Sequence, residues 1–362
     1  MARLGLSIYP EHSELKADLA YLRMAGNYGF KRVFTCLLSA GDEPKEELIA
    51  KFRERIDAAH ECGMEVVLDV NPAVFGKLGA SYEDLSAFAE MHADGIRLDE
   101  GFDGMHTSAL TFNPQGLKIE LNSSTEMGYI ENVMSHFPDR KKLITCHNFY
   151  PQKYTGVSLE HFNRCNAFIK EKGLNIAAFV SSQQKDAAGP WPLQEGLCTL
   201  EMHREVPLDF QVRHMFATGM VDDVLIANAY ASEEELAVCA SVNPSVLTFG
   251  ICLEKELTET EKAILYLKEG HVVRGDMSEY MIRSSWPRIA FADQSIPAAN
   301  TRDLKRGDVV ILNDGYGRYK GELHIVLKDM PNDGRKNVIG HLPVYEKVLL
   351  DYAEPWKHFA FL

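Results

Sequence analysis

Polar and titratable side chains stand directly after a series of short apolar segments in this chain of 362 residues. Carboxylates, amides, an arginine and aromatic hydroxyls recur there, a mixture that can move protons and bind a polar ligand. Each one alone has a structural explanation, since Asn caps helices and Tyr packs at rims. Their joint occurrence after at least six segments indicates an active site. The candidates are Tyr9, Glu11, Asp69, Asn71, Arg97, Asp99, Asn122, His147, Asn148, Tyr150 and Asn228.

The spacing of some candidates carries further information. Arg97 and Asp99 alternate along one segment, so both side chains point to the same side, and a structural ion pair is the alternative interpretation. A long polar stretch, residues 181–204, adds Glu195, Glu201 and Arg204. Stretches of this length in compact domains are usually lids or binding loops. Glu201 and Arg204 could instead pair simply as i, i+3 neighbours on a helix.

The segments that position these side chains repeat one pattern of apolar strand, polar turn and amphipathic helix. Eight such units in roughly 240 residues predict an α/β fold, a (β/α)8 TIM barrel, whose chemistry lies at the carboxyl ends of its strands. A doubly wound open sheet is the alternative, but it usually has fewer strands and a glycine-rich first turn. The predicted strands are residues 4–8, 32–36, 65–70, 95–98, 117–121, 142–146, 175–180 and 223–226. The predicted helices include residues 13–25, 44–62, 82–91, 126–136, 158–171 and 232–240.

The pattern changes after about residue 243. One helix over residues 258–268 precedes short β-type runs at 280–283, 309–312, 322–327 and 337–342, separated by Gly- and Asn-containing turns. We therefore predict a barrel domain at 1–243 and a small, mostly β domain at 244–362. The second contains Arg283, Arg318, Tyr319 and Lys320 near glycines and hydroxyls, which could bind a phosphate or simply lie in a solvated turn.

Charge and composition exclude several classes of function. The 52 Asp and Glu against 38 Lys and Arg give a net charge of −14, which makes nucleic acid and anionic membranes poor partners. Neither a transmembrane stretch nor a signal-peptide pattern is present, and the seven cysteines are scattered, so we expect a cytoplasmic protein. Asp69, Asp99 and His147 could in principle hold a divalent ion. Because paired His ligands are missing, however, we expect neither a metal nor a cofactor.

A set of short motifs carries a family resemblance over essentially the whole chain. They are Ser7-Ile-Tyr9-Pro-Glu11, Leu68-Asp69-Val-Asn71-Pro, Arg97-Leu-Asp99, Cys146-His147-Asn148-Phe-Tyr150-Pro-Gln, the stretch from Glu195 to Arg204, Asn228-Ala-Tyr230-Ala-Ser and Gly317-Arg-Tyr-Lys-Gly-Glu322. In combination they resemble the 6-phospho-N-acetylmuramidase family of the MupG type. The resemblance implies a TIM barrel followed by a cyclophilin-like β-barrel domain.

The same resemblance implies a cytoplasmic bacterial glycosidase that acts in cell-wall recycling, on peptidoglycan fragments. Its substrate would be the small-molecule disaccharide MurNAc-6-phosphate–GlcNAc, split into MurNAc-6-phosphate and GlcNAc. Two alternatives stay open. One is another phosphosugar enzyme on the same barrel, an isomerase or an ether-cleaving enzyme. The other is a non-catalytic carbohydrate-binding protein. The oligomeric state is left open.

A glycosidase needs a protonated acid for the leaving oxygen and a second group facing the oxocarbenium-like centre. We expect Asp69, Asp99 and Glu201 to be catalytic, and the other candidates to bind substrate. Asp99 beside Arg97 is expected to stay ionised, as a base, nucleophile or stabiliser. Glu201, on a loop that can close against Trp191, is expected to be the acid with a raised pKa. The substrate's 2-acetamido group is an alternative nucleophile, and retention and inversion of configuration both stay open.

The uneven distribution of charge predicts where the phosphate binds. Residues 1–269 hold 25 Lys and Arg against 40 Asp and Glu, a net charge of −15, whereas residues 270–362 hold 13 against 12. A phosphate approaching the first segment alone would be repelled. We therefore expect the second domain to reach over the barrel mouth and bind the phosphate through Arg283 and Arg318, with Lys320 and Tyr319 as further partners.

Overall fold

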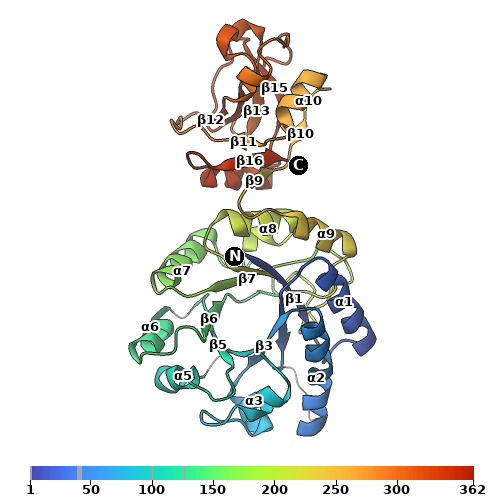
Figure 1. The fold of residues 1–362 in the computed structure, drawn as a ribbon, viewed down its shortest axis with the longest axis vertical. Coiled ribbons are helices and arrows are strands. Elements are labelled where there is room, and N and C mark those ends of the chain that lie inside the picture. The colour runs from blue at the N-terminus through green and yellow to red at the C-terminus, as the bar shows by residue number, and fades with distance from the viewer. Residues whose placement is uncertain (1, 39–42, 100, 126) are drawn as a thin grey trace. The chain divides into compact units, whose positions relative to one another are not determined.

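The structure is a computed structural model, and it describes residues 2–38, 43–99, 101–125 and 127–362 (Figure 1). The chain divides into two compact units, Met1–Val242 and Asn243–Leu362. Each unit has its own sheets and its own buried residues, so each is described by itself.

The first unit is a closed barrel of parallel strands, which confirms the predicted TIM barrel. Strands pair in chain order, and β8 closes the ring on β1. Most strand residues are buried, because the barrel interior covers one face of each strand and helices cover the other. The strands are β1 (Arg3–Ile8), β2 (Arg32–Cys36), β3 (Glu65–Val70), β4 (Gly95–Leu98), β5 (Lys118–Asn122), β6 (Leu143–Cys146), β7 (Ile176–Val180) and β8 (Asp223–Ile226).

Helices surround the strands (Figure 1). Two of them begin where serine was expected to cap them. The Ser158 hydroxyl accepts a hydrogen bond from the His161 N–H, and Ser232 forms a reciprocal capping box with Glu235. The helices are α1 (Leu15–Asn27), α2 (Lys45–Glu61), α3 (Pro72–Leu78), α4 (Ser86–Glu90), α5 (Gly104–Leu110), α6 (Met127–Ser135), α7 (Leu159–Glu171), α8 (Leu208–Ala217) and α9 (Glu233–Ser241).

The helix predicted over residues 82–91 is shorter in the structure, where α4 covers only Ser86–Glu90. The backbones of Ser81 and Asp84 bond each other in both directions, at 3.0 and 3.4 Å, and the Asp84 carboxylate accepts the Ser86 N–H. Side chains of this type compete with helical hydrogen bonds, so the helix begins only after this turn. The predicted start of the next helix, residue 126, lies outside the described residues.

A buried ion network fills the barrel near the amino ends of its strands. Arg32 donates through Nη1 to Asp223 Oδ2 at 2.7 Å and through Nη2 to Glu120, and all three side chains are almost fully buried. Arg3 adds two further hydrogen bonds to Asp223, at 2.7 and 2.6 Å. The candidate site residues lie at the carboxyl ends of the strands. This ion network is therefore a separate group of charged residues.

We expect Arg32→Met to destabilise the protein by about 3–5 kcal/mol, because it leaves the Glu120 carboxylate buried without its partner. Unfolding in urea measures the loss. Lys172→Met is the matched control, since Glu131 lies 3.5 Å away in an exposed pair, and about 0–1 kcal/mol is expected there. The double variant Arg32→Met/Glu120→Met should recover part of the loss. A double variant no more stable than Arg32→Met would show that packing, not charge, sets the cost.

The second unit is mostly β, as predicted. An antiparallel sheet has the order β10-β15-β13-β14-β12, and a three-stranded sheet has the order β11-β16-β9. The four predicted β-type runs correspond to β12 to β15. The strands are β9 (Leu247–Phe249), β10 (Cys252–Leu253), β11 (His271–Val272), β12 (Met281–Ser284), β13 (Asp308–Leu312), β14 (Leu323–Val326), β15 (Lys336–His341) and β16 (His358–Phe361). Its short helices are α10 (Glu259–Leu265) and α11 (Pro287–Ala290).

The second unit also contains a largely apolar cavity of about 610 Å3. Two of the three tryptophans of the chain, Trp286 and Trp356, line it, together with Val273, Phe291 and neighbouring residues. Both indoles are exposed.

In the described ranges of both units, no helix has the length and apolar character needed to span a bilayer.

Candidate active site

One arginine at the carboxyl end of the barrel holds three of the predicted residues together. Arg97 in β4 lies beside Asp69 in β3 in the strand register. Its Nη1 donates to Asp69 Oδ1 at 2.6 Å and to Asp99 Oδ1 at 3.1 Å, and its Nη2 donates to Asn148 Oδ1. The guanidinium is almost fully buried. The predicted common side of Arg97 and Asp99 is therefore correct, and the ion pair includes Asp69 as well.

A cavity of about 150 Å3 opens over this cluster. Asp69, Arg97, Asp99 and Asn148 supply its polar lining. Its apolar lining comes from Phe34, Leu38, Phe149, Phe179 and Trp191. Aromatic walls with a few convergent polar groups are typical of sites that orient a small ligand. We call it the catalytic cavity.

The aromatic wall is a packed unit, and sequence reasoning missed most of it. The rings of Phe34, Phe149 and Phe179 meet edge to face with centroids 5.1–6.0 Å apart. Phe34 and Phe179 lie inside strands, and Phe149 directly follows the predicted Asn148. The sequence signal for this wall is the presence of large aromatic residues on the inward side of barrel strands. Trp191, with 39% of its surface exposed, comes from the loop after β7.

The two carboxylates of the cluster lie in different surroundings. The Asp69 side chain is 7% exposed, whereas that of Asp99 is 30% exposed. Burial raises the pKa of Asp69 to about 6, although the Arg97 guanidinium opposes this rise. A carboxyl group with this pKa keeps its proton for part of the time near neutral pH. Asp69 therefore has the property that a general acid requires.

The raised pKa expected for Glu201 is wrong, because this carboxylate is fully engaged as an acceptor. Arg204 donates to it through Nε and Nη2, both at 2.7 Å. The backbone N–H groups of Tyr154 and Gly156 donate to it at 2.8 Å. The Arg204 bonds above all, followed by these backbone bonds, lower the pKa of Glu201 to about 2. Glu201 thus stays ionised and cannot supply a proton near neutral pH.

The pair of Glu201 and Arg204 joins two loops of the rim. Arg204 Nη1 donates to the backbone carbonyls of Tyr150, Glu195 and Gly196 at 3.0, 2.9 and 3.2 Å. The loop after β6 is thereby tied to the loop after β7. Glu201 and Arg204 thus form the i, i+3 pair that was the alternative interpretation. Their contacts hold the two loops of the rim together.

Several other candidates make contacts that position the backbone. The Tyr9 hydroxyl donates to the Ala227 carbonyl, and the Asn71 side chain accepts the Val74 N–H at 3.0 Å, as an N-cap. Asn122 accepts the Ser124 N–H at 2.8 Å.

Two further candidates are held by partners outside the catalytic cavity. His147 lies between Ser124 Oγ, at 3.1 Å, and Asn166 Oδ1, at 2.7 Å, and burial lowers the pKa of His147 to about 4. Glu11 lies 3.3 Å from Lys51. The contacts of His147 and Glu11 are therefore those of residues with a structural role.

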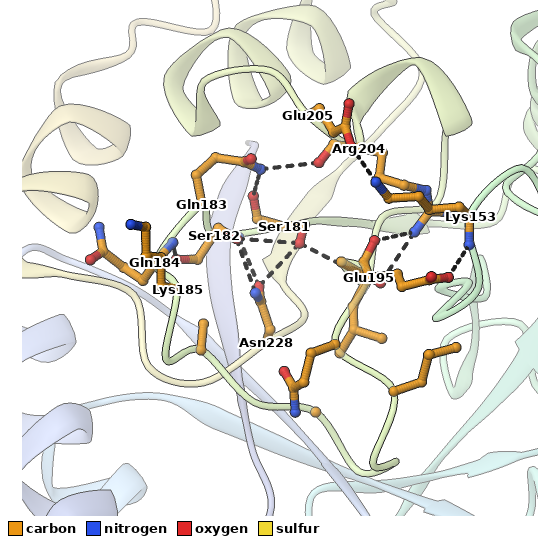
Figure 2. Close-up of a pocket in the computed structure, with 16 residues that line it drawn as sticks. Lys153, Ser181, Ser182, Gln183, Gln184, Lys185, Glu195, Arg204, Glu205 and Asn228 are labelled. Atoms are coloured by element: carbon orange, nitrogen blue, oxygen red, sulfur yellow. Dashed lines mark hydrogen bonds and ion pairs between the residues drawn. The ribbon is translucent and has the colours of Figure 1, made fainter.

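A second cavity, of about 220 Å3, is lined mainly by the loop that follows β7, with Asn228 from the loop after β8 and Lys153 from the loop after β6 (Figure 2). Asn228 and Ser182 both line it, and two hydrogen bonds join them. Asn228 accepts the Ser182 N–H at 2.7 Å and donates to the Ser182 carbonyl at 3.0 Å. Glu195 lines it as well and accepts the Lys153 N–H at 2.9 Å. We call it the rim cavity.

One of the predicted phosphate residues of the second unit, Arg283, shares a buried carboxylate with Arg288. Arg283 and Arg288 both bind Glu322, at 3.3 and 2.5 Å. Arg318 and Arg288 lie over the Tyr319 ring, 5.1 and 5.3 Å from its centroid.

Lys320, also among the predicted residues, lies 3.6 Å from Asp314. Arg288 is the member of this group that the sequence analysis did not select. In the described part of the chain, no three His, Cys, Asp or Glu side chains come together as a metal site.

Comparisons with solved structures support the fold. An uncharacterised B. cereus protein is 48% identical, with all of both chains covered and a TM-score of 0.90. A conserved Enterococcus faecalis protein of unknown function is 24% identical, with 100% of this chain and 96% of that chain covered and a TM-score of 0.75, which shows likeness of fold alone. The comparison with curated proteins finds no match.

Two sequence-family profiles match the chain. The N-terminal profile of 6-phospho-N-acetylmuramidase matches residues 4–241, and the C-terminal profile matches residues 247–362. The matches coincide with the two structural units and contain the Asp69–Arg97–Asp99 cluster. The chain therefore belongs to the 6-phospho-N-acetylmuramidase family, which is a family of glycosidases.

Proposed function

We propose that this enzyme hydrolyses MurNAc-6-phosphate–GlcNAc to MurNAc-6-phosphate and GlcNAc, in the cytoplasm, during recycling of the bacterial cell wall. The observation that carries the proposal is the pair Asp69 and Asp99, held by one arginine beneath an aromatic-walled cavity. Glycoside hydrolysis requires two such carboxyl groups, one protonated and one ionised. Membership of the family supports the choice of sugar substrate, and the Asp69–Arg97–Asp99 cluster supports the type of reaction.

Asp69 is the general acid in this proposal. Its proton passes to the glycosidic oxygen as the bond from the anomeric carbon to that oxygen breaks, so GlcNAc leaves as a neutral alcohol. The raised pKa of Asp69, about 6, leaves this proton in place over part of the pH range of the cell. The buried Arg97 holds Asp69 in position. Glu201, the acid expected from the sequence, takes no part in this step.

Asp99 acts on the opposite side of the reaction centre. Either its carboxylate attacks the anomeric carbon, or it orients the substrate's 2-acetamido oxygen to do so. Water then completes the hydrolysis, with Asp69 accepting its proton. Both routes use two displacements and retain the configuration of the sugar. Carboxyl groups lie about 5 Å apart in retaining enzymes and about 6.5–9.5 Å apart in inverting ones. The single Nη1 atom that binds both carboxylates favours the shorter separation.

Mass spectrometry of products tests the proposal. We expect GlcNAc and MurNAc-6-phosphate in equal amounts from the phosphorylated disaccharide, and slower turnover of the unphosphorylated one. Proton NMR of the first product formed is expected to show retained configuration. Release of lactate would identify an ether-cleaving enzyme. A product of unchanged mass would identify an isomerase. Binding without turnover would identify a carbohydrate-binding protein. Each of these three results would overturn the proposal.

A further inference from the structure

One loop of the barrel borders both cavities. Trp191, in the loop after β7, lines the catalytic cavity, while Gly189 and Leu193, two residues to either side, line the rim cavity. A ligand held against Trp191 therefore has the rim cavity as its neighbour along this loop.

The loop around the rim cavity is held in place before any ligand binds. Asn228 fixes Ser182 through two hydrogen bonds. From the capping box of α9, the Glu235 carboxylate accepts the Ser182 hydroxyl at 2.7 Å and the Gln183 N–H at 2.9 Å. Binding to such a preorganised loop costs less conformational entropy than binding to a loop that must first become ordered.

Among the charged residues that line the rim cavity, cations outnumber carboxylates by one. Lys153, Lys185 and Arg204 supply three cations, and Glu195 and Glu205 supply two carboxylates. Arg204 is occupied by Glu201 and by backbone carbonyls. Lys153 pairs with Glu205 at 2.6 Å.

Lys185 is exposed and has no ion-pair partner among the residues that the structure describes. Figure 2 shows it on the side of the cavity opposite Lys153. A lysine in this state can take an anionic ligand without first giving up a partner.

The position of the cavity points to one kind of anion. In TIM barrels the loops after the seventh and eighth strands frequently form a phosphate site. The loop after β7 supplies most of the lining of the rim cavity, and Asn228 after β8 completes it together with Lys153 after β6. In the second unit Glu322 neutralises part of the charge of Arg283 and Arg288, while Arg318 lies over the Tyr319 ring. The unpaired Lys185 and the fixed polar loop lie on the same unit as Asp69 and Asp99.

We propose that the rim cavity binds the 6-phosphate of the substrate, with Lys185 as its principal cationic contact. This inference rests on the proposed function. It replaces the sequence-based expectation that Arg283 and Arg318 bind the phosphate. It makes the barrel sufficient for both catalysis and recognition of the phosphorylated sugar.

Glu195 provides a test of opposite sign. Its carboxylate lines the cavity and repels a dianion, so Glu195→Gln is expected to raise kcat/KM for the phosphorylated disaccharide a few-fold. If the cavity instead binds the hydroxyl groups of a neutral sugar, Glu195 is an acceptor for them, and the same change lowers kcat/KM for both disaccharides. Glutamine can still accept the Lys153 N–H, so the loop contact is kept.

The main experiment measures kcat/KM of Lys185→Gln on the phosphorylated and unphosphorylated disaccharides. A charge-assisted contact is worth roughly 10- to 150-fold. We expect a loss in that range on the phosphorylated substrate alone. Lys141→Gln is the matched control, since it makes the same change of charge just before β6, at the other end of the barrel. An equal loss on both substrates, or none, overturns the inference, as does a selective loss in Arg318→Gln.

Two further measurements separate the sources of anionic charge. A 6-phosphorylated GlcNAc–GlcNAc lacks the lactyl carboxylate of muramic acid, and Lys185→Gln is expected to lose the same factor on it. An unchanged rate there would assign Lys185 to the lactyl group. Calorimetric titration with inorganic phosphate, with weaker binding expected in Lys185→Gln, needs no turnover. If the wild type hydrolyses neither disaccharide, the proposed function fails, while this titration still tests the cavity.

Discussion

Replacing Asp69 with Asn is expected to slow hydrolysis of the natural disaccharide about 10²- to 10⁴-fold, the usual effect of removing a general acid. The amide keeps an oxygen for the Arg97 contact but has no acidic proton to give. A 4-nitrophenyl glycoside of MurNAc-6-phosphate tests this role, because its leaving group departs without protonation. We expect the variant to lose far less kcat/KM on it, since kcat/KM reports the steps up to departure of the leaving group and not the later attack of water, in which Asp69 acts as the base. Equal losses of kcat/KM on both substrates would exclude Asp69 as the acid.

The pKa of Asp69 also predicts a pH dependence. Since the protonated form is the active one and its pKa is about 6, kcat/KM is expected to fall tenfold per pH unit well above pH 6. The phosphate group titrates nearby, with a pKa of about 6, but a preference for its dianion would raise the rate with pH, the opposite direction. In Asp69→Asn the falling limb should disappear. Its persistence would place the acid elsewhere.

Asp99→Asn is expected to lower turnover at least ~10²-fold while leaving the fold intact. Unlike the change at Asp69, it should affect the disaccharide and the nitrophenyl glycoside alike, because the leaving group does not relieve the loss of a nucleophile or of the group that orients one. Asp57→Asn, an exposed carboxylate on α2, is the control. Near-normal turnover in a folded Asp99→Asn protein would remove Asp99 from the mechanism. Rescue of this variant by the nitrophenyl substrate would show that Asp99, and not Asp69, is the general acid.

Much of the barrel could be predicted because its signals are local. The strand over residues 95–98 was predicted with the bounds that β4 has, and Ser158 and Ser232 cap the helices they were expected to begin. Where prediction failed, another local contact decided the outcome. The bonded turn at Ser81 and Asp84 delays α4.

The roles of the site residues depended on contacts that the sequence does not display. Glu201 is kept ionised partly by backbone groups of Tyr154 and Gly156, which lie 45 or more positions earlier in the chain. The raised pKa of Asp69 comes from burial, which depends on the closed barrel. Spacing could place Arg97 beside Asp99, but the sharing of Arg97 with Asp69 depends on the register of two strands.

The distribution of tryptophans gives the protein an internal optical probe. Trp191 borders the catalytic cavity, while Trp286 and Trp356 border a cavity of the second unit. Replacing the latter two with Phe would leave Trp191 as the sole indole. Because this side chain is partly solvated, a sugar that covers it would change its emission. Stopped-flow fluorescence of the single-tryptophan protein could then follow filling and emptying of the catalytic cavity separately from bond cleavage, even in variants that no longer turn over.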